Sequence, residues 1–72
     1  MKVFVQIVNC DNGVYQTGMI DEPVSEGLEI ANAVRHFCDT SIEWLSTTII
    51  NGHTTKIGLV KDTNKIVSAI CL

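Results

Sequence analysis

The chain has 72 residues, of which 46% are hydrophobic and 18% charged, and its formal net charge is −3. This length fits one domain spanning residues 1–72, and the apolar content excludes an intrinsically disordered chain. The mildly acidic balance disfavours nucleic acid as a partner, because binding to phosphate requires a basic surface. No apolar run approaches the ~20 residues of a membrane span, and the apolar start is too short for a signal peptide. We therefore expect a soluble, cytoplasmic protein with no membrane partner.

Two strands joined by a tight turn are predicted at the start of the chain. Lys2–Asn9 is rich in valine, isoleucine and phenylalanine, which is typical of a strand. An Asn-Gly pair at 12–13 is a strong hairpin signal, because both residues tolerate positive φ angles. The chain then returns as a second strand over residues 14–20. A two-residue loop pairs Cys10 with Tyr15 and Val8 with Thr17.

A helix is predicted over Glu26–Cys38, after Pro23 has ended the second strand. Ser25 is the expected N-cap, with Asp21 as the alternative if the helix begins earlier. A wheel of 3.6 residues per turn places one apolar stripe on this helix. The stripe consists of Gly27, Ile30, Ala31, Val34, Phe37 and Cys38. Its small residues would let the helix backbone lie close to a flat surface, which indicates a sheet.

The region after the helix is ambiguous until the chain reaches Ile50. Thr40 and Glu43 have the spacing of a capping box, whereas the β-branched run 47–50 favours a strand. We expect a helical turn or an extended segment over 40–44, followed by a strand to Ile50. Trp44 is expected to anchor the core, with a role in an interface as the alternative.

A second Asn-Gly pair at 51–52 predicts a second hairpin, with its returning strand over residues 54–61. The two-residue loop pairs Ile50 with His53 and Thr48 with Thr55, and it places Trp44 and Leu59 further along the same side. Turn-forming residues occupy 62–65, and a last strand covers 66–72. The predicted fold is therefore α+β with element order ββαβββ. One amphipathic helix packs on a small antiparallel or mixed sheet.

The sequence predicts no catalytic residue, no metal site and no cofactor. Its three cysteines, Cys10, Cys38 and Cys71, are widely spaced, and we expect each to be a small buried hydrophobe. Cys38 with nearby His36 is the best alternative for a reactive thiol. Residues two apart on a helix do not face each other, however, so this pairing is poor. A thiol or hydrolytic enzyme is accordingly the least favoured function.

The first, second and last strands carry apolar residues on both faces, unlike a sheet with one face in water. A helix ~10 Å across covers about half of one face of a sheet whose five strands lie ~4.8 Å apart. Phe4, Val8, Tyr15 and Met19 lie on the face opposite the presumed helix. Because monomers rarely expose a large apolar patch, we expect these residues to form the interface of a homo-oligomer, most simply a dimer.

Two functional hypotheses follow. The first is a non-catalytic module that acts through protein–protein contacts, as an accessory or inhibitory protein, with itself or a heterologous protein as partner. The second is an oligomer that sequesters a small ligand, for example an anion, between its subunits. The candidate ligand-binding residues for the second hypothesis are His53, Thr55 and Lys56, at a hydroxyl-rich hairpin end.

Overall fold

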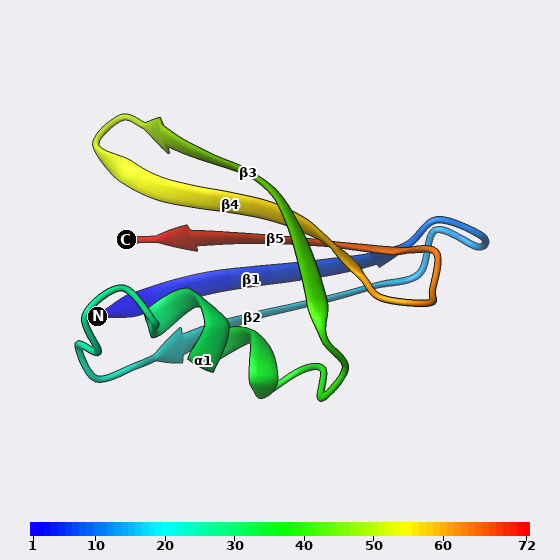
Figure 1. Cartoon of the computed structure of the whole chain (residues 1–72), viewed down its shortest axis with the longest axis horizontal. Coiled ribbons are helices and arrows are strands. Elements are labelled where there is room, and N and C mark those ends of the chain that lie inside the picture. Colours follow the sequence, from blue (N-terminus) through cyan, green and yellow to red (C-terminus); the bar gives the residue numbers. More distant parts are fainter.

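The computed structural model describes all residues, 1–72, and contains five strands and one helix. The elements in chain order are β1 (Lys2–Asn9), β2 (Tyr15–Asp21), α1 (Glu29–Arg35), β3 (Ile42–Ile50), β4 (His53–Val60) and β5 (Lys65–Cys71) (Figure 1). The predicted α+β class and the order ββαβββ are confirmed. The first strand has its predicted bounds, whereas β2, β4 and β5 are each displaced by one residue from their predicted ranges. The segment over residues 40–44 is extended, because β3 begins at Ile42 without a preceding helical turn.

The five strands form a single sheet in the order β2-β1-β5-β4-β3, and every neighbouring pair is antiparallel. This arrangement settles the choice that the sequence left between an antiparallel and a mixed sheet. The helix α1 packs on one side of the sheet against the central strands β1 and β5 (Figure 1). We call this side the helix-side face and the opposite side, which no element covers, the open face.

The core lies between α1 and the helix-side face. Its sheet residues are mostly small, and α1 contributes three apolar side chains from its inner surface. The buried residues are Val3, Val5, Ile7, Val60, Val67 and Ala69 from the sheet, with Ile30, Ala33 and Val34 from the helix. Burying a valine or isoleucine side chain contributes about 1.5–3 kcal/mol, so this one layer supplies most of the hydrophobic stabilisation.

The helix is shorter than predicted, because the chain makes a tight turn before it begins. Glu26 and Gly27 both have positive φ angles, 55° and 92°, which are incompatible with a right-handed helix. Leu28 donates its N–H to the carbonyl of Ser25 at 3.2 Å and stands at the N-cap position without a side-chain cap bond. The predicted capping role of Ser25 and the start at Glu26 were therefore wrong.

The helical stripe was partly correct. Ile30 and Val34 are buried as predicted, and Phe37 and Cys38 pack against the core although they follow the end of α1. Gly27 is exposed in the turn instead of lying on the stripe. Ala33 was not assigned to the stripe, yet it is fully buried. The stripe differs because the predicted helix spans thirteen residues, whereas α1 has seven.

The first hairpin has a four-residue loop, so the predicted register was wrong. Asn9 donates to the carbonyl of Val14, and Gly13 donates to the carbonyl of Asn9, each at 2.8 Å. Tyr15 consequently pairs with Val8 instead of Cys10. A shift of two residues returns every side chain to its predicted face, because side chains alternate with a period of two. It also leaves Cys10 exposed in the turn, so the prediction of a buried Cys10 was wrong.

The second hairpin has the predicted two-residue turn. Asn51 and Gly52 have φ angles of 50° and 81°, and the predicted pairs Ile50–His53 and Thr48–Thr55 are both present. The prediction fails further along, because a β-bulge interrupts the pairing between Trp44 and Ser46. A one-residue shift reverses the faces beyond it, so Trp44 pairs with Gly58 on the helix-side face, away from Leu59. There it packs against the core, as expected of an anchor.

Candidate functional site

Three central rows of side chains cross the open face from β2 to β3, as the strand registers define them, and the charged pair Lys2 and Asp21 lies on the same face beyond the first row. The first row is Met19, Phe4, Ile70, Thr55 and Thr48. The second row is Thr17, Gln6, Ser68, Ile57 and Ser46. The third row is Tyr15, Val8, Ile66, Leu59 and Glu43. Two largely apolar rows thus flank a row of mostly uncharged polar residues, and the single charge among the fifteen positions is Glu43 at the β3 end.

The four predicted interface residues lie together on this face. Phe4 is the cross-strand neighbour of Met19, and Val8 is that of Tyr15. Tyr15 and Met19 are 64% and 48% exposed, whereas Phe4 and Val8 are half-buried by the side chains around them. Their juxtaposition is therefore as predicted, while their role as an interface stays a prediction.

Sequence reasoning missed the part of the open face that lies on the other strands. Ile57 is 42% exposed and Ile66 is 39% exposed, and Ile70 and Leu59 are half-buried beside them. These residues belong to the site only because β5 lies between β1 and β4, and the sequence alone did not establish that order. One usable signal was the last strand, which is apolar on both of its faces.

The three candidate ligand-binding residues do not converge. His53 and Thr55 lie on the open face, whereas Lys56 lies on the helix-side face, because consecutive residues of a strand point to opposite sides. His53 Nδ1 lies 2.9 Å from the carbonyl oxygen of Cys71, and the Thr55 hydroxyl donates to the carbonyl of His53 at 3.4 Å. The Lys56 ammonium lies 5.7 Å from the centre of the Trp44 ring.

Lys56 instead lines a shallow hollow of about 270 Å³ beside the start of α1. The other lining residues are Met1, Gly27, Glu29, Ile30, Thr54 and Cys71. Burial, together with the negative charge of Glu29, raises the pKa of the Cys71 thiol, although Lys56 and the amino terminus oppose this effect. The thiol is therefore protonated near neutral pH, which makes Cys71 a poor nucleophile.

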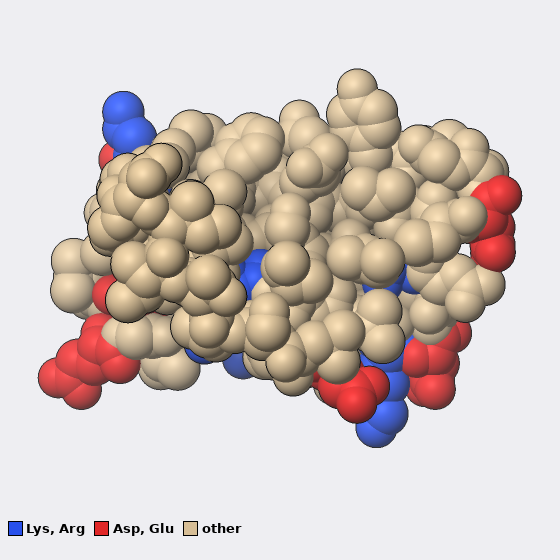
Figure 2. Space-filling view, turned by 90° about the horizontal axis from the view of Figure 1, so that it is seen from above, with Lys and Arg blue, Asp and Glu red and all other residues tan.

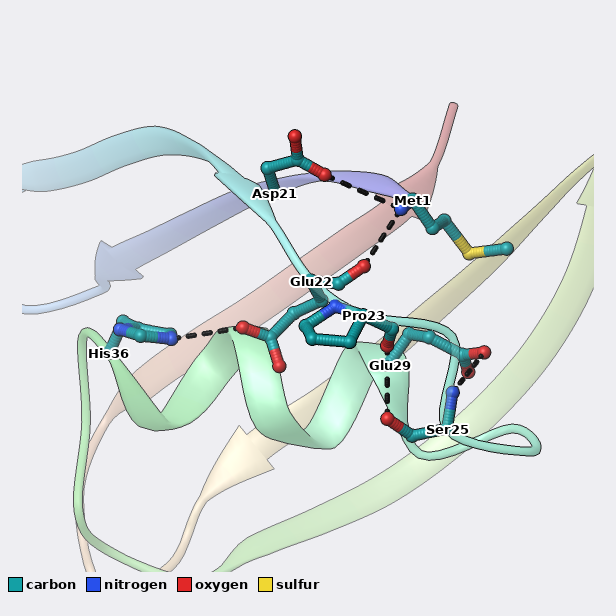
Figure 3. Close-up of polar contacts among 7 residues, drawn as sticks. All are labelled: Met1, Asp21, Glu22, Pro23, Ser25, Glu29 and His36. Carbon is teal, nitrogen blue, oxygen red and sulfur yellow. Dashed lines mark hydrogen bonds and ion pairs between the residues drawn. The ribbon is translucent and has the colours of Figure 1, made fainter.

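Glu29, which Figure 3 shows beside the turn that precedes α1, is buried, although it does not belong to the predicted apolar stripe. Its carboxylate accepts the backbone N–H of Ser25 at 3.0 Å. Backbone N–H groups, first its own and then those of Ser25 and Gly27, lower the pKa of Glu29 from its ordinary value, against the opposing effect of burial. The carboxylate thus stabilises the turn that precedes α1.

The remaining histidine and cysteines also make contacts within the protein. His36 Nε2 lies 3.1 Å from a carboxylate oxygen of Glu22, and this pair ties the end of α1 to the end of β2 (Figure 3). Cys38 Sγ lies 3.9 Å from the carbonyl oxygen of Thr40, and all three cysteines are unpaired. No group of three or more His, Cys, Asp or Glu side chains is arranged to hold a metal ion. None of the helical segments has the length and apolar character needed to cross a membrane.

No family model, curated protein or solved structure gives a significant match to this chain.

Proposed function

We propose that this protein is a non-catalytic binding module that acts through protein–protein contacts of its open face, and that a second copy of the chain is its first partner. The observation that carries the proposal is the exposure of a sheet face whose three central rows contain one charged residue, with no element of the chain packed on it. A soluble monomer with one wet sheet face normally alternates apolar and polar residues instead.

The size of the open face is consistent with a moderate interface. Five strands at ~4.8 Å spacing and about seven residues at ~3.3 Å each give a projected area of roughly 450 Å². Stable complexes bury ~800 Å² of accessible surface on each partner, and accessible area exceeds projected area on a side-chain-covered face. We therefore expect self-association in the micromolar range.

The contacts of the chemically capable side chains support a non-catalytic role. His36 pairs with Glu22, His53 contacts a backbone carbonyl, and the pKa of the Cys71 thiol is raised. The separation of Lys56 from His53 and Thr55 also favours the binding module over the ligand-sequestering alternative. The three unpaired cysteines suit a reducing compartment, so the proposal includes a cytoplasmic location.

Sedimentation velocity from low micromolar to submillimolar concentration tests the proposal. We expect the wild-type chain to sediment above its monomer mass of 7.9 kDa as concentration rises. Met19→Glu adds a charge to an exposed position of the open face, and we expect it to weaken the association at least tenfold.

The matched control is Val24→Glu, which adds the same charge at a 74% exposed residue in the segment between β2 and α1. It should associate as the wild type does. A wild-type chain that stays monomeric throughout the range, or equal effects of the two substitutions, would contradict a contact through the open face.

A further inference from the structure

The outer edge of β3 offers a second contact surface, separate from the open face. The stretch from Trp44 to Ile50 contains no charged residue and no proline. Leu45, Ile49 and Ile50 are 57%, 71% and 53% exposed. Proteins usually protect an edge strand by charge, proline, short length or a β-bulge. The nine-residue strand β3 has a bulge at Leu45, but the residues after it, 46–50, have no charge and no proline. Figure 2, which looks onto the β3 side of the molecule, shows charged side chains mainly around the rim of a broad uncharged surface.

The turn geometry establishes which backbone groups of β3 point outward. In a hairpin with a two-residue loop, the residues that flank the loop form a hydrogen-bonded pair, here Ile50 and His53. Hydrogen-bonded positions alternate along an antiparallel strand, so Thr48 also bonds to β4. Thr47 and Ile49 lie between these positions, and their N–H and C=O groups are directed away from β4. None of the backbone hydrogen bonds made outside the regular elements involves either residue.

We propose that β3 pairs antiparallel with β3 of a second copy, in the register that places Thr48 opposite the partner's Thr48. In this register Thr47 faces the partner's Ile49, and Ile49 faces the partner's Thr47. All the outward N–H and C=O groups of these residues are then paired across the twofold axis. A shift of two residues would bring either the Asn51-Gly52 turn or the bulge at Leu45 into the ladder, so this register is the best one.

Side-chain chemistry supports the same pairing. Although each copy carries a net charge of −3, the paired segments bring no charges into opposition. The two Thr48 side chains of the pair lie on the open face. Threonine is β-branched, and β-branched residues favour strands. The joined sheet makes the two open faces continuous, so the edge contact enlarges the surface available to another partner.

The other edge strand, β2, is less suited to this role. It has seven residues, contains Gly18 at its centre and ends in Asp21. The ring of Phe37 lies against Gly18 on the helix-side face. We therefore assign the edge contact to β3 alone.

Disulfide trapping tests the register. A non-hydrogen-bonded antiparallel pair has a Cα separation of ~4.5 Å, within the range of ~4.4–6.8 Å that a disulfide spans. In a Cys10→Ser background, which removes the exposed native thiol, Thr48→Cys should form a covalent dimer under mild oxidation. Ser46→Cys is the matched control on the same strand and face. It would lie about four residues, or ~13 Å, from its counterpart and should not crosslink.

Ile49→Lys tests the edge by charge repulsion. The side chain is exposed, so the melting temperature should not change, while crosslinking through Thr48→Cys should fall at least tenfold. Met19→Glu should leave crosslinking intact, which separates failure of the edge contact from failure of the open-face contact. Absence of crosslinking, equal crosslinking by Ser46→Cys, or full crosslinking in the presence of Ile49→Lys would overturn the proposal.

Discussion

The two faces of the sheet are built from alternate residues of the same strands, and both carry apolar residues, yet at the centre of the sheet they differ in side-chain size. Beneath α1 the central strands present Val5, Val67 and Ala69, all fully buried. Directly beside them, the open face presents Phe4 and Ile70. Small side chains let a helix approach the sheet closely, whereas large ones build a raised surface. At the centre of the sheet, side-chain size therefore distinguishes the covered face from the open one.

The same contrast appears in how each face is covered. The helix-side face has two close contacts with glycine, where Phe37 lies on Gly18 and Trp44 lies over Gly58. The open face has no such contact, and Tyr15 and Met19 extend from it into solvent. The structure thus assigns folding to one face and leaves the other free, so substitutions on the two faces should have separable effects.

The largest difference is expected for a buried negative charge. Val34→Asp on α1 places an unpaired carboxylate at a site that is 1% exposed, and it should unfold the domain by costing more than about 4 kcal/mol. Ile66→Asp on the open face lies at a 39% exposed site and should cost roughly 1 kcal/mol. Urea titration followed by circular dichroism measures both changes. Similar midpoints for the two variants would show that the faces are not distinct.

A smaller effect is expected when a methyl group is added beneath each aromatic ring. A Cβ at position 58 would meet the backbone carbonyl oxygen of Glu43 at 2.9 Å, as well as side chains of Ile42 and Trp44. Because a backbone atom cannot rotate away, Gly58→Ala should cost about 1–3 kcal/mol. Gly18→Ala would meet only the Phe37 ring, which can turn aside, and should cost less. Thermal melts compare the two, and a greater loss for Gly18→Ala would contradict this account.

The smallest effect concerns the pH dependence of stability. The pKa of Glu29 is lowered in the folded chain, so its contribution is present above the pKa of an unfolded glutamate. That contribution is lost as the pH falls through the lower folded pKa. Glu29→Gln should therefore make stability less dependent on pH below about 4. Melting curves recorded from pH 3 to pH 7 would show it, and an unchanged slope would contradict a stabilising role for the carboxylate.

The fold class followed from local signals that the tertiary structure does not override. The Asn-Gly pair at 51–52 produced the predicted turn and pairs, and strand alternation identified the apolar faces. The errors arose where a backbone angle decided the outcome. Glu26 has a positive φ, which is uncommon for a residue without a polar group close to the backbone, and this shortened the helix. The bulge at Leu45 could not be predicted either, because it leaves no clear signal in the residue pattern.

The candidate site was predictable in part because side chains alternate between the two faces along a strand. The wrong loop length did not affect the four predicted interface residues. The observed register differs from the predicted one by two residues, which keeps Phe4, Val8, Tyr15 and Met19 on one face. The contribution of β5 and β4 required the strand order, which depends on long-range pairing. The grouping of Lys56 with Thr55 had a simpler fault, because adjacent strand residues cannot share a face.

The bulge in β3 has a consequence for how the length of this chain can vary. Removing Leu45 would restore regular pairing without changing any partner, because Trp44 already pairs with Gly58 and Ser46 with Ile57. The indole would therefore keep its place above Gly58 on the helix-side face. Loss of the Leu45 codon would thereby leave both faces of the sheet unchanged, as would length changes at the 10–13 turn. Natural or engineered length variants that lack Leu45 or change the 10–13 turn should therefore both be tolerated.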